Sequence, residues 1–244
     1  MHEAGESLTL DYVDGVVRLA LDRPDRWNAI DTATLLCLIE VLDRRDHPAV
    51  PLLVEGATGV FSVGSDLPEL AGFDALSATV YSQLGHQAVA ALERWPGVTI
   101  AAVDGFCLGA GLELALGCDL IVATRTGRFG LPGLPLALMP CLGGLRRLAC
   151  RMDQGVSTRL FLAGEVITSA QGLELGLVNE VIDELDDALN IARRHRDWPA
   201  SGIEAIRSLR LDRHGSIDST AEADLFAETF AHGECQRRLR RLIG

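Results

Sequence analysis

The sequence predicts an α/β fold with a helical carboxyl-terminal region. Segments with the apolar pattern of strands alternate with segments of helical period through the first half of the chain, and helical periods dominate afterwards. Hydrophobic residues make up 48% and charged residues 23% of the 244 residues, as in a folded chain with a sizeable core. This length suits one large domain, or one domain with a small appendage.

The first half of the chain opens with a predicted β-hairpin. Residues 8–12 and 16–21 have strand patterns, and Asp14-Gly15 between them is a typical two-residue turn. Asp31 can cap the first helix, and Pro96-Gly97 ends the long one. The elements expected after the hairpin are a helix over 32–45, a strand over 50–54, a helix over 76–95, a strand over 98–103, a helix over 111–117 and a strand over 120–123.

The second half follows a Gly- and Pro-rich segment over 129–142 and is expected to be mostly helical. A shift in composition near residue 183 marks the one plausible boundary, and the tail after it is too polar to form a core of its own. The predicted helices are 143–151, 153–162, 169–174, 184–196, 201–211 and 218–240.

Charge and composition exclude several classes of function. The 22 cationic residues are all arginine, and 34 acidic residues give a net charge of −12. This acidic balance counts against nucleic-acid binding, which needs a basic face. Because the chain has no lysine, Schiff-base chemistry is excluded. The six cysteines form no Cys-x-x-Cys pair or zinc-ligand spacing, so no metal is expected.

The location of the protein is predicted from what the sequence lacks. The first twelve residues, MHEAGESLTLDY, are acidic and have no apolar stretch of the kind found in signal peptides. No apolar run reaches the roughly 18–20 residues that span a bilayer. We therefore expect a cytoplasmic protein without a membrane partner.

Two glycine-containing turns follow predicted buried strands. The segment 61–67 reads FSVGSDL, and Gly109-Ala110-Gly111 opens a helix after the strand at 98–103. Turns at the carboxyl ends of adjacent parallel strands lie close together, where ligands of such sheets bind. Backbone N–H groups converging from both turns would form an oxyanion hole. Taken alone, the turn at 109–111 is weak evidence, because glycine turns between a strand and a helix are common and more often have a purely structural role.

Together these segments resemble the signature turns of the crotonase (enoyl-CoA hydratase/isomerase) superfamily. Support comes from LDRPDRWNAID at 21–31, FGLPGLPLALMPCLGGLRRL at 129–148 and AGEVITSAQGLELGLVNEVI at 163–182, in the family's order and spacing. The resemblance implies a spiral of ββα repeats over residues 1–183, which would hold the active site. It also implies a helical region over 184–244 that makes contacts within a homotrimer or hexamer.

The resemblance also implies an acyl-CoA thioester substrate, with coenzyme A as part of the substrate and no separate cofactor. The backbone N–H groups of Ser65 and Ala110 match the oxyanion-hole positions, although the family more often has alanine and glycine there. The positions that match substrate- and CoA-binding residues are Arg26, Ala29, Val63, Gly64, Asp66, Leu67, Gly109, Pro132 and Gly133. For Asp66, an alternative role is to hold its own turn.

Glu113 is the candidate catalytic residue. It lies among leucines just after the glycine turn, where desolvation should raise its pKa and suit it to general acid/base work. By resemblance, it matches one of the two glutamates with which hydratases activate water. The alternative is a structural glutamate that favours the helix start or pairs with an arginine.

The second glutamate of the hydratases is missing, because the matching segment reads Pro132-Gly133 instead of Pro-Glu. Cys141 and His86 are the possible substitutes, although the first also suits an apolar filler and the second a surface or interface histidine. Arg237, Arg238, Arg240 and Arg241 could meet CoA phosphates, or form an exposed helix end.

The leading prediction is therefore an enoyl-CoA hydratase that works with one of the two usual glutamates. Two alternatives remain open: another crotonase-fold enzyme, namely an isomerase, decarboxylase or thioester hydrolase, and a non-catalytic acyl-CoA-binding accessory subunit.

Overall fold

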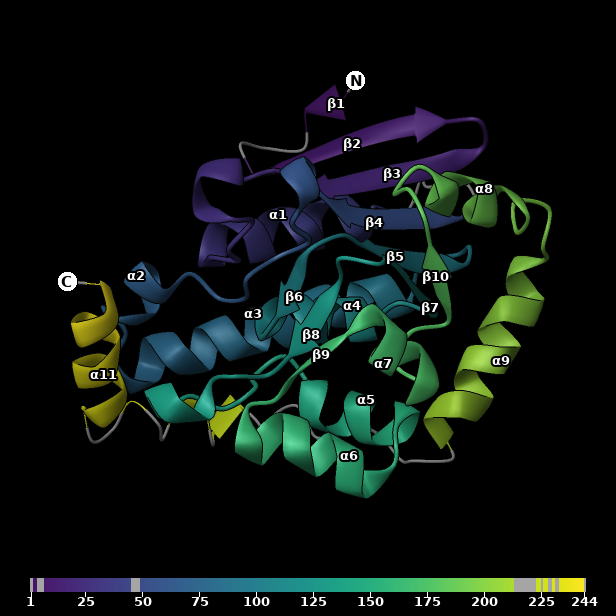
Figure 1. Ribbon diagram of the computed structural model, residues 1–244. Helices are drawn as coiled ribbons and strands as arrows, with labels where there is room; N and C mark the ends of the chain where they lie inside the picture. Colours follow the sequence, from purple (N-terminus) through teal and green to yellow (C-terminus); the bar gives the residue numbers. More distant parts are fainter. Residues whose placement is uncertain are drawn as a thin grey trace.

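A seven-stranded sheet forms the centre of the computed structural model, which describes residues 2–3, 7–44, 49–212, 223–224, 226–227, 230 and 233–243 (Figure 1). The strands pair in the order β1-β2-β3-β4-β5-β7-β10, antiparallel from β1 to β3 and parallel from β3 onwards. Their bounds are β1 His2–Glu3, β2 Leu8–Val13, β3 Val16–Leu21, β4 Leu52–Gly56, β5 Thr99–Val103, β7 Leu120–Thr124 and β10 Glu180–Ile182.

A second, three-stranded sheet lies beside the first. It consists of β6 (Phe106–Leu108), β8 (Arg128–Gly130) and β9 (Val166–Thr168). Strand β6 pairs with β8 in parallel, and β8 pairs with β9 antiparallel. The chain passes through β5, β6 and α4, and then through β7, β8 and α5, so it repeats a ββα order. The predicted α/β fold with ββα repeats is confirmed.

Helices cover both faces of the large sheet. Val54 of β4 packs in one apolar cluster with Leu35 of α1 and Leu92 of α3, whereas its neighbour Leu53 packs in the other cluster with Ile191 of α8. This alternation is what a strand buried on both faces requires. The α-helices are α1 Thr32–Leu42, α2 Leu67–Leu70, α3 Ala75–Glu93, α4 Ala110–Leu116, α5 Gly144–Arg151, α6 Gln154–Thr158, α7 Ser169–Glu174, α8 Asp187–Arg193, α9 Ala200–Asp212 and α11 Glu234–Ile243.

The second half is mostly helical, as predicted, but the prediction placed no strand after residue 142 and in this it is wrong. Strands β9 and β10 lie in this part of the chain, and β8 falls partly in the segment expected to be an irregular Gly/Pro-rich stretch. Each spans three residues, too few for an alternating pattern to be recognised. The helix expected over 153–162 is also interrupted: α6 ends at Thr158, and a π-helical turn continues over Arg159–Ala163.

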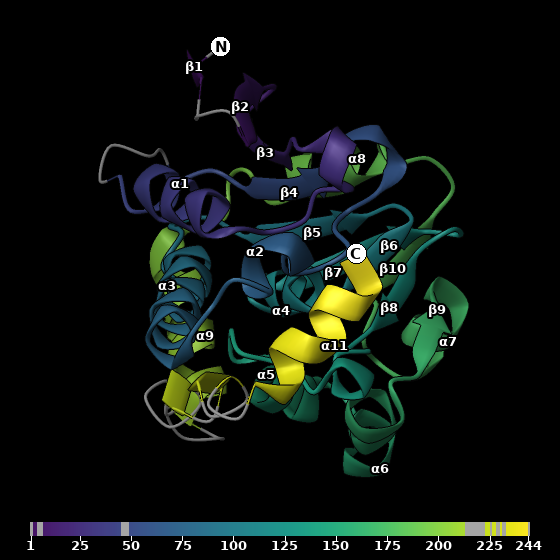
Figure 2. The ribbon, with the colours of Figure 1, turned by 90° about the vertical axis from the view of Figure 1, so that its left-hand side faces the viewer.

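Described residues near the end of the chain pack on the same molecule. Phe226, Phe230, Cys235 and Leu239 are almost fully buried in the larger apolar cluster. The sequence also predicts Leu225 on this apolar face, with Phe226 and Phe230 at helical spacing, but Leu225 lies outside the described residues. Helix α11 runs in front of α4 and α5 in Figure 2 and contacts α2. Among the helices that the structure describes, none has both the length and the apolar character needed to cross a bilayer.

Candidate active site

The two glycine-containing turns at the strand ends contact each other. Gly64 has φ +103° and Gly109 has φ +49°, and residues other than glycine rarely adopt these backbone conformations. A methyl group on Gly64 would lie 3.0 Å from the Leu108 carbonyl oxygen and 3.4 Å from the Ala110 nitrogen. Glycine is therefore needed at position 64 both for its conformation and for the close approach of the turns.

The backbone around Ser65 and Ala110 leaves their amide groups available. Next to Ser65, the Gly64 amide donates to Ser62 Oγ at 3.1 Å and the Asp66 amide donates to the Ile30 carbonyl at 2.9 Å. The structure gives the Ser65 and Ala110 amides no acceptor among the described residues. Ala110 begins α4, where the first N–H groups have no partner within the helix.

Both residues line a cavity of about 430 Å³. The sequence-predicted residues that also line it are Arg26, Ala29, Val63, Gly64, Asp66, Leu67, Gly109, Glu113, Pro132, Gly133 and Cys141. The predicted residues that do not line it are His86 and the four arginines Arg237, Arg238, Arg240 and Arg241. The rest of the wall, which the sequence analysis did not identify, consists of Asp25, Trp27, Pro68, Leu70, Leu131, Leu136, Leu138, Met139, Pro140 and Phe226.

Glu113 is 1% exposed, and its carboxylate is held by the loop over residues 141–144. Oε1 accepts the backbone N–H groups of Leu142 and Gly144, each at 2.8 Å, and Oε2 accepts that of Cys141 at 3.2 Å. A methyl group on Gly144 would come within 2.4 Å of Glu113 Cγ, so this approach needs glycine. The three donors orient the carboxylate in a buried position that opens on the cavity.

The position of the second hydratase glutamate carries no side chain. Gly133 has φ −79° and ψ −28°, values open to any residue. A methyl group there would lie 3.1 Å from the Leu138 carbonyl oxygen and 3.3 Å from Leu138 Cβ, which is a tight fit. Leu138 thus occupies part of the space that a side chain at position 133 would need.

The two possible substitutes lie in different surroundings. Cys141 is buried in the cavity wall, and its carbonyl oxygen accepts a hydrogen bond from Ser82 Oγ at 2.7 Å. His86 packs behind the loop, where a methyl group on Gly143 would lie 3.3 Å from His86 Cε1. Burial, followed by the nearby Arg147 guanidinium, lowers the pKa of His86 to about 4 against the opposing effect of Glu93. His86 is therefore neutral near pH 7. It also does not line the cavity.

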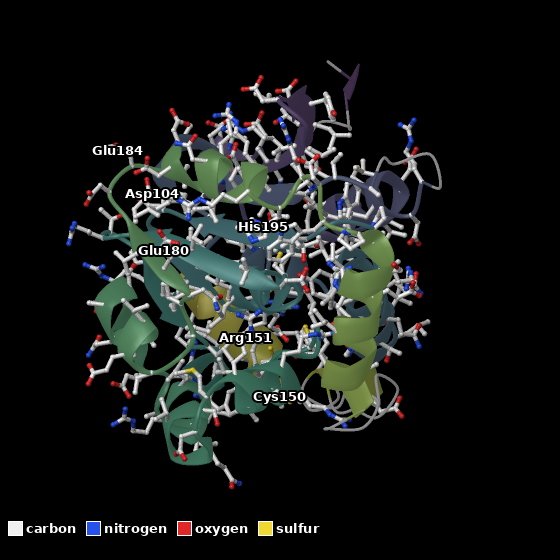
Figure 3. All side chains as sticks on the ribbon, turned by 90° about the vertical axis from the view of Figure 1, so that its right-hand side faces the viewer. Asp104, Cys150, Arg151, Glu180, Glu184 and His195 are labelled. Carbon is white, nitrogen blue, oxygen red and sulfur yellow. The ribbon has the colours of Figure 1, made fainter. Side chains whose placement is uncertain are left out.

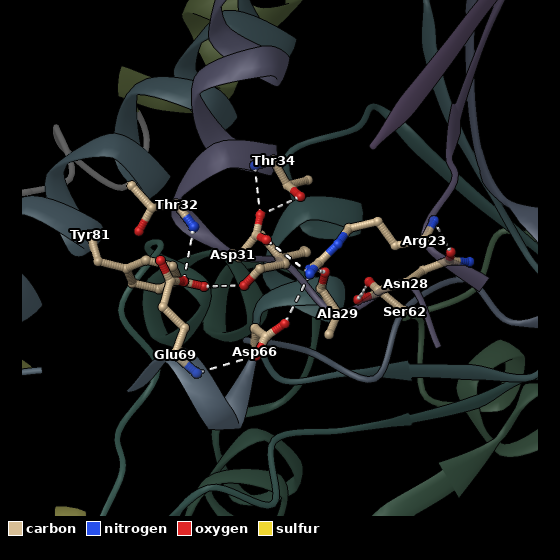
Figure 4. Close-up of polar contacts among 11 residues, drawn as sticks. Arg23, Asn28, Ala29, Asp31, Thr32, Thr34, Ser62, Asp66, Glu69 and Tyr81 are labelled. Atoms are coloured by element: carbon tan, nitrogen blue, oxygen red, sulfur yellow. Dashed lines mark hydrogen bonds and ion pairs between the residues drawn. The ribbon is translucent and has the colours of Figure 1, made fainter. Parts of the chain in front are cut away.

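A network around Arg23 supports the cavity wall from behind (Figure 4). The guanidinium donates to the Ala29 carbonyl oxygen at 2.5 Å, and its Nη2 pairs with Asp31 at 2.9 Å and with Asp66 at 3.1 Å. Asp66 also caps α2 by accepting the Glu69 amide. The charge of Asp66 is thus already paired within the protein, in keeping with the alternative that it holds its turn.

Tyr81 of α3 supports the same wall from a fully buried position. Its hydroxyl donates to the Ile30 carbonyl oxygen at 2.9 Å, which also accepts the Asp66 amide. Burial raises the pKa of Tyr81 well above its usual value, so the hydroxyl stays protonated. The sequence carried no signal for Arg23 or Tyr81, because their partners lie up to 51 residues away along the chain.

The basic stretch near the end of the chain lies beside the cavity. Helix α11 contacts α2 and the 3-10 turn Leu134–Leu136, and both of these elements contribute lining residues. Arg238 donates to the Pro135 carbonyl oxygen at 2.7 Å. Arg237, Arg240 and Arg241 are exposed on the same helix.

On the opposite side of the molecule, Figure 3 labels the exposed Cys150. The described residues contain no cluster suited to a metal ion.

The spiral and its cavity define a protein of the crotonase type, and comparisons with known proteins agree. A family model described as enoyl-CoA hydratase/isomerase matches residues 11–241. The 2,3-dehydroadipyl-CoA hydratase of Escherichia coli (strain K12) is 38% identical over 210 residues, which cover 84% of this chain and 82% of the relative. The crotonyl-CoA hydratase of Syntrophomonas wolfei is 29% identical over 238 residues, covering 95% of this chain and 90% of the relative.

A crystal structure of an enoyl-CoA hydratase/isomerase from Mycobacterium paratuberculosis superposes with a TM-score of 0.90 at 20% identity, covering 98% of this chain and 100% of that one. This similarity shows the fold. The chain therefore belongs to the enoyl-CoA hydratase/isomerase family, and the resemblance noted in its sequence is confirmed. Membership supports enzyme activity of the hydratase type on acyl-CoA thioesters.

Proposed function

We propose that the protein catalyses the reversible hydration of an α,β-unsaturated acyl-CoA thioester, with Glu113 as the acid/base group. The observation that carries this proposal is that the buried Glu113 carboxylate opens on the same cavity as the Ser65 and Ala110 amides. Both amides would donate to the thioester carbonyl oxygen, which becomes enolate-like during the reaction. Each such donor is worth roughly 3–4 kcal/mol of transition-state stabilisation.

In the hydration direction, Glu113 takes a proton from a water molecule while the water oxygen bonds to the β-carbon. The electron pair of the C=C bond moves through the α-carbon towards the thioester carbonyl, where the two amides stabilise the negative charge. The α-carbon then takes a proton as the carbonyl reforms. Because Gly133 has no side chain to deliver this proton, Glu113 returns the one that it received, and the carboxylate is regenerated.

The CoA portion of the bound substrate would extend out of the cavity past the segment around Arg26 and Ala29. Arg26 and Trp27 are exposed where they line the cavity, so this side is open to solvent. The exposed arginines of α11 offer positive charge to the phosphate groups of CoA, since guanidinium groups bind phosphate well. The names of the relatives support an enoyl-CoA substrate but differ in the acyl group, which is crotonyl in one and 2,3-dehydroadipyl in the other.

Incubation with crotonyl-CoA and with longer trans-2-enoyl-CoAs tests the proposal. Mass spectrometry in ¹⁸O-labelled water should show a hydrated thioester that carries the heavy oxygen. Glu113→Gln serves as the control, because it keeps the shape of the side chain and removes the base. Binding of the thioesters without any turnover would overturn the proposal and favour the accessory acyl-CoA-binding subunit.

A further inference from the structure

We infer that the acyl group accepted by this cavity ends in a hydrocarbon and not in a second carboxylate. The inference rests on the proposed function for the orientation of the substrate, because it takes the thioester carbonyl to lie at Ser65 and Ala110. A dehydroadipyl group, the substrate in the name of the Escherichia coli relative, has a second carboxylate at the far end of its chain. A hexenoyl group of the same length ends in a methyl group.

The charges around the cavity have a clear arrangement. The charged residues of its described lining are the acidic Asp25, Asp66 and Glu113 and a single cation, Arg26. Arg26 is exposed on the short 3-10 helix over residues 24–26, next to the exposed Trp27, on the side from which CoA would leave. Arg26 is thus the one positive charge among the described lining residues, and it lies at the CoA end of the substrate.

Most of the remaining lining of the cavity is apolar. Leu70, Leu131, Leu138 and Phe226 are buried there, and Leu136 and Met139 are half-buried. All six residues pack in or against the larger apolar cluster of the protein. The backbone N–H groups of Cys141, Leu142 and Gly144 do not help either, because they already donate to Glu113.

A second substrate carboxylate would therefore lose its hydration against leucine, methionine and phenylalanine side chains, with no described cation to pair with it. The buried Glu113 carboxylate would add repulsion between like charges. A terminal methyl group at the same place would instead gain from burial of its apolar surface. The cavity therefore selects for the apolar chain end.

Binding of two saturated thioesters of equal length tests this directly. Hexanoyl-CoA and adipoyl-CoA differ only in a methyl group against a carboxylate, and neither contains the double bond needed for hydration. By isothermal titration calorimetry, we expect hexanoyl-CoA to bind at least tenfold more tightly. Equal binding, or tighter binding of adipoyl-CoA, would overturn the inference, as would the failure of both to bind. Tighter binding of hexanoyl-CoA together with no turnover of trans-2-hexenoyl-CoA would support the inference and contradict the proposed function.

A pair of variants at Met139 provides the matched control. Met139 is half-buried in the cavity lining, so a guanidinium placed there can enter the cavity while its stem stays among apolar groups. Met139→Arg should reduce the preference for hexanoyl-CoA at least tenfold, and Met139→Leu should keep it. An unchanged preference in Met139→Arg would count against the assignment of this wall to the chain end.

Discussion

Replacing Glu113 with glutamine tests the chemistry most directly, because the contacts of Glu113 predict a small loss of folding stability and a much larger loss of kcat. The amide oxygen of glutamine can accept the Leu142 and Gly144 N–H groups that now bind Oε1. The amide nitrogen would instead face the Cys141 N–H, so that one buried donor loses its acceptor. Leaving such a donor unsatisfied costs about 1–3 kcal/mol. Proteins are typically stable by about 5–15 kcal/mol, so the variant should still fold.

The catalytic loss should be much larger than the structural one. Loss of a general acid/base group lowers the rate by about 10²–10⁴-fold, and no other carboxylate is placed to compensate at Gly133. The decrease in absorbance of the conjugated enoyl thioester measures kcat, and urea unfolding measures stability on the same samples.

Glu93→Gln is the matched control for Glu113→Gln. It removes a carboxylate that pairs with Arg147, at 2.9 Å, behind the same loop and outside the cavity lining. It should lower stability while kcat stays within a few-fold of the wild type. A Glu113→Gln variant with the wild-type kcat would refute the proposed mechanism. Cys141→Ala would then be the next variant to measure, since that thiol is buried in the same wall.

Four further predictions follow from the structure and the sequence. Gly133→Glu should hydrate crotonyl-CoA faster than Gly133→Ala. The alanine variant is the control, because its Cβ makes the same tight contact with Leu138 but carries no carboxyl group. Equal rates in the two variants would show that the missing acid does not limit the reaction. Tyr81→Phe removes the hydrogen bond to Ile30 and should lower kcat several-fold with KM nearly unchanged, whereas a change in KM alone would exclude this supporting role. Since the pKa of His86 is about 4 in the folded state and 6.5 in the unfolded state, the unfolded state takes up the proton first as the pH falls. The free energy of unfolding should therefore decrease from pH 6.5 to pH 4, and less so in His86→Gln; identical slopes would contradict the assignment. Finally, light scattering at micromolar concentration should give the mass of a trimer or hexamer, and a monomer would refute the expected assembly.

Patterns of local sequence carried most of the information about the fold. The hairpin around Asp14-Gly15 and helices such as α3 have clear periods and boundaries, so they were predicted to within a few residues. Strands β8, β9 and β10 were missed because three residues cannot display a period. Their pairing partners, rather than their own sequences, determine that they are strands.

The candidate site divides in the same way. Glycine turns and a glutamate among leucines are local features, and the structure brings Ser65, Ala110 and Glu113 to one cavity. The Arg23 network depends on contacts between segments far apart in the chain, such as that with Asp66, and no local pattern reveals them. The exclusion of His86 from the cavity likewise follows from the packing of α3 behind the loop, which its position in the sequence did not show.

The change at Gly133 is not confined to one residue. The Gly133 carbonyl oxygen accepts the backbone N–H groups of Leu136 at 2.9 Å and Leu138 at 3.1 Å, which closes the 3-10 turn onto the glycine. Leu138 therefore lies where a side chain at 133 would begin, and its own side chain contributes to the apolar wall. Loss of the carboxyl group and the apolar character of this wall are thus parts of the same local arrangement. A glutamate restored at 133 would have to move Leu138 by a few tenths of an ångström, and so would disturb the wall that we assign to the acyl chain. For this reason, any gain in rate from Gly133→Glu should be smaller for hexenoyl-CoA, whose chain reaches this wall, than for crotonyl-CoA.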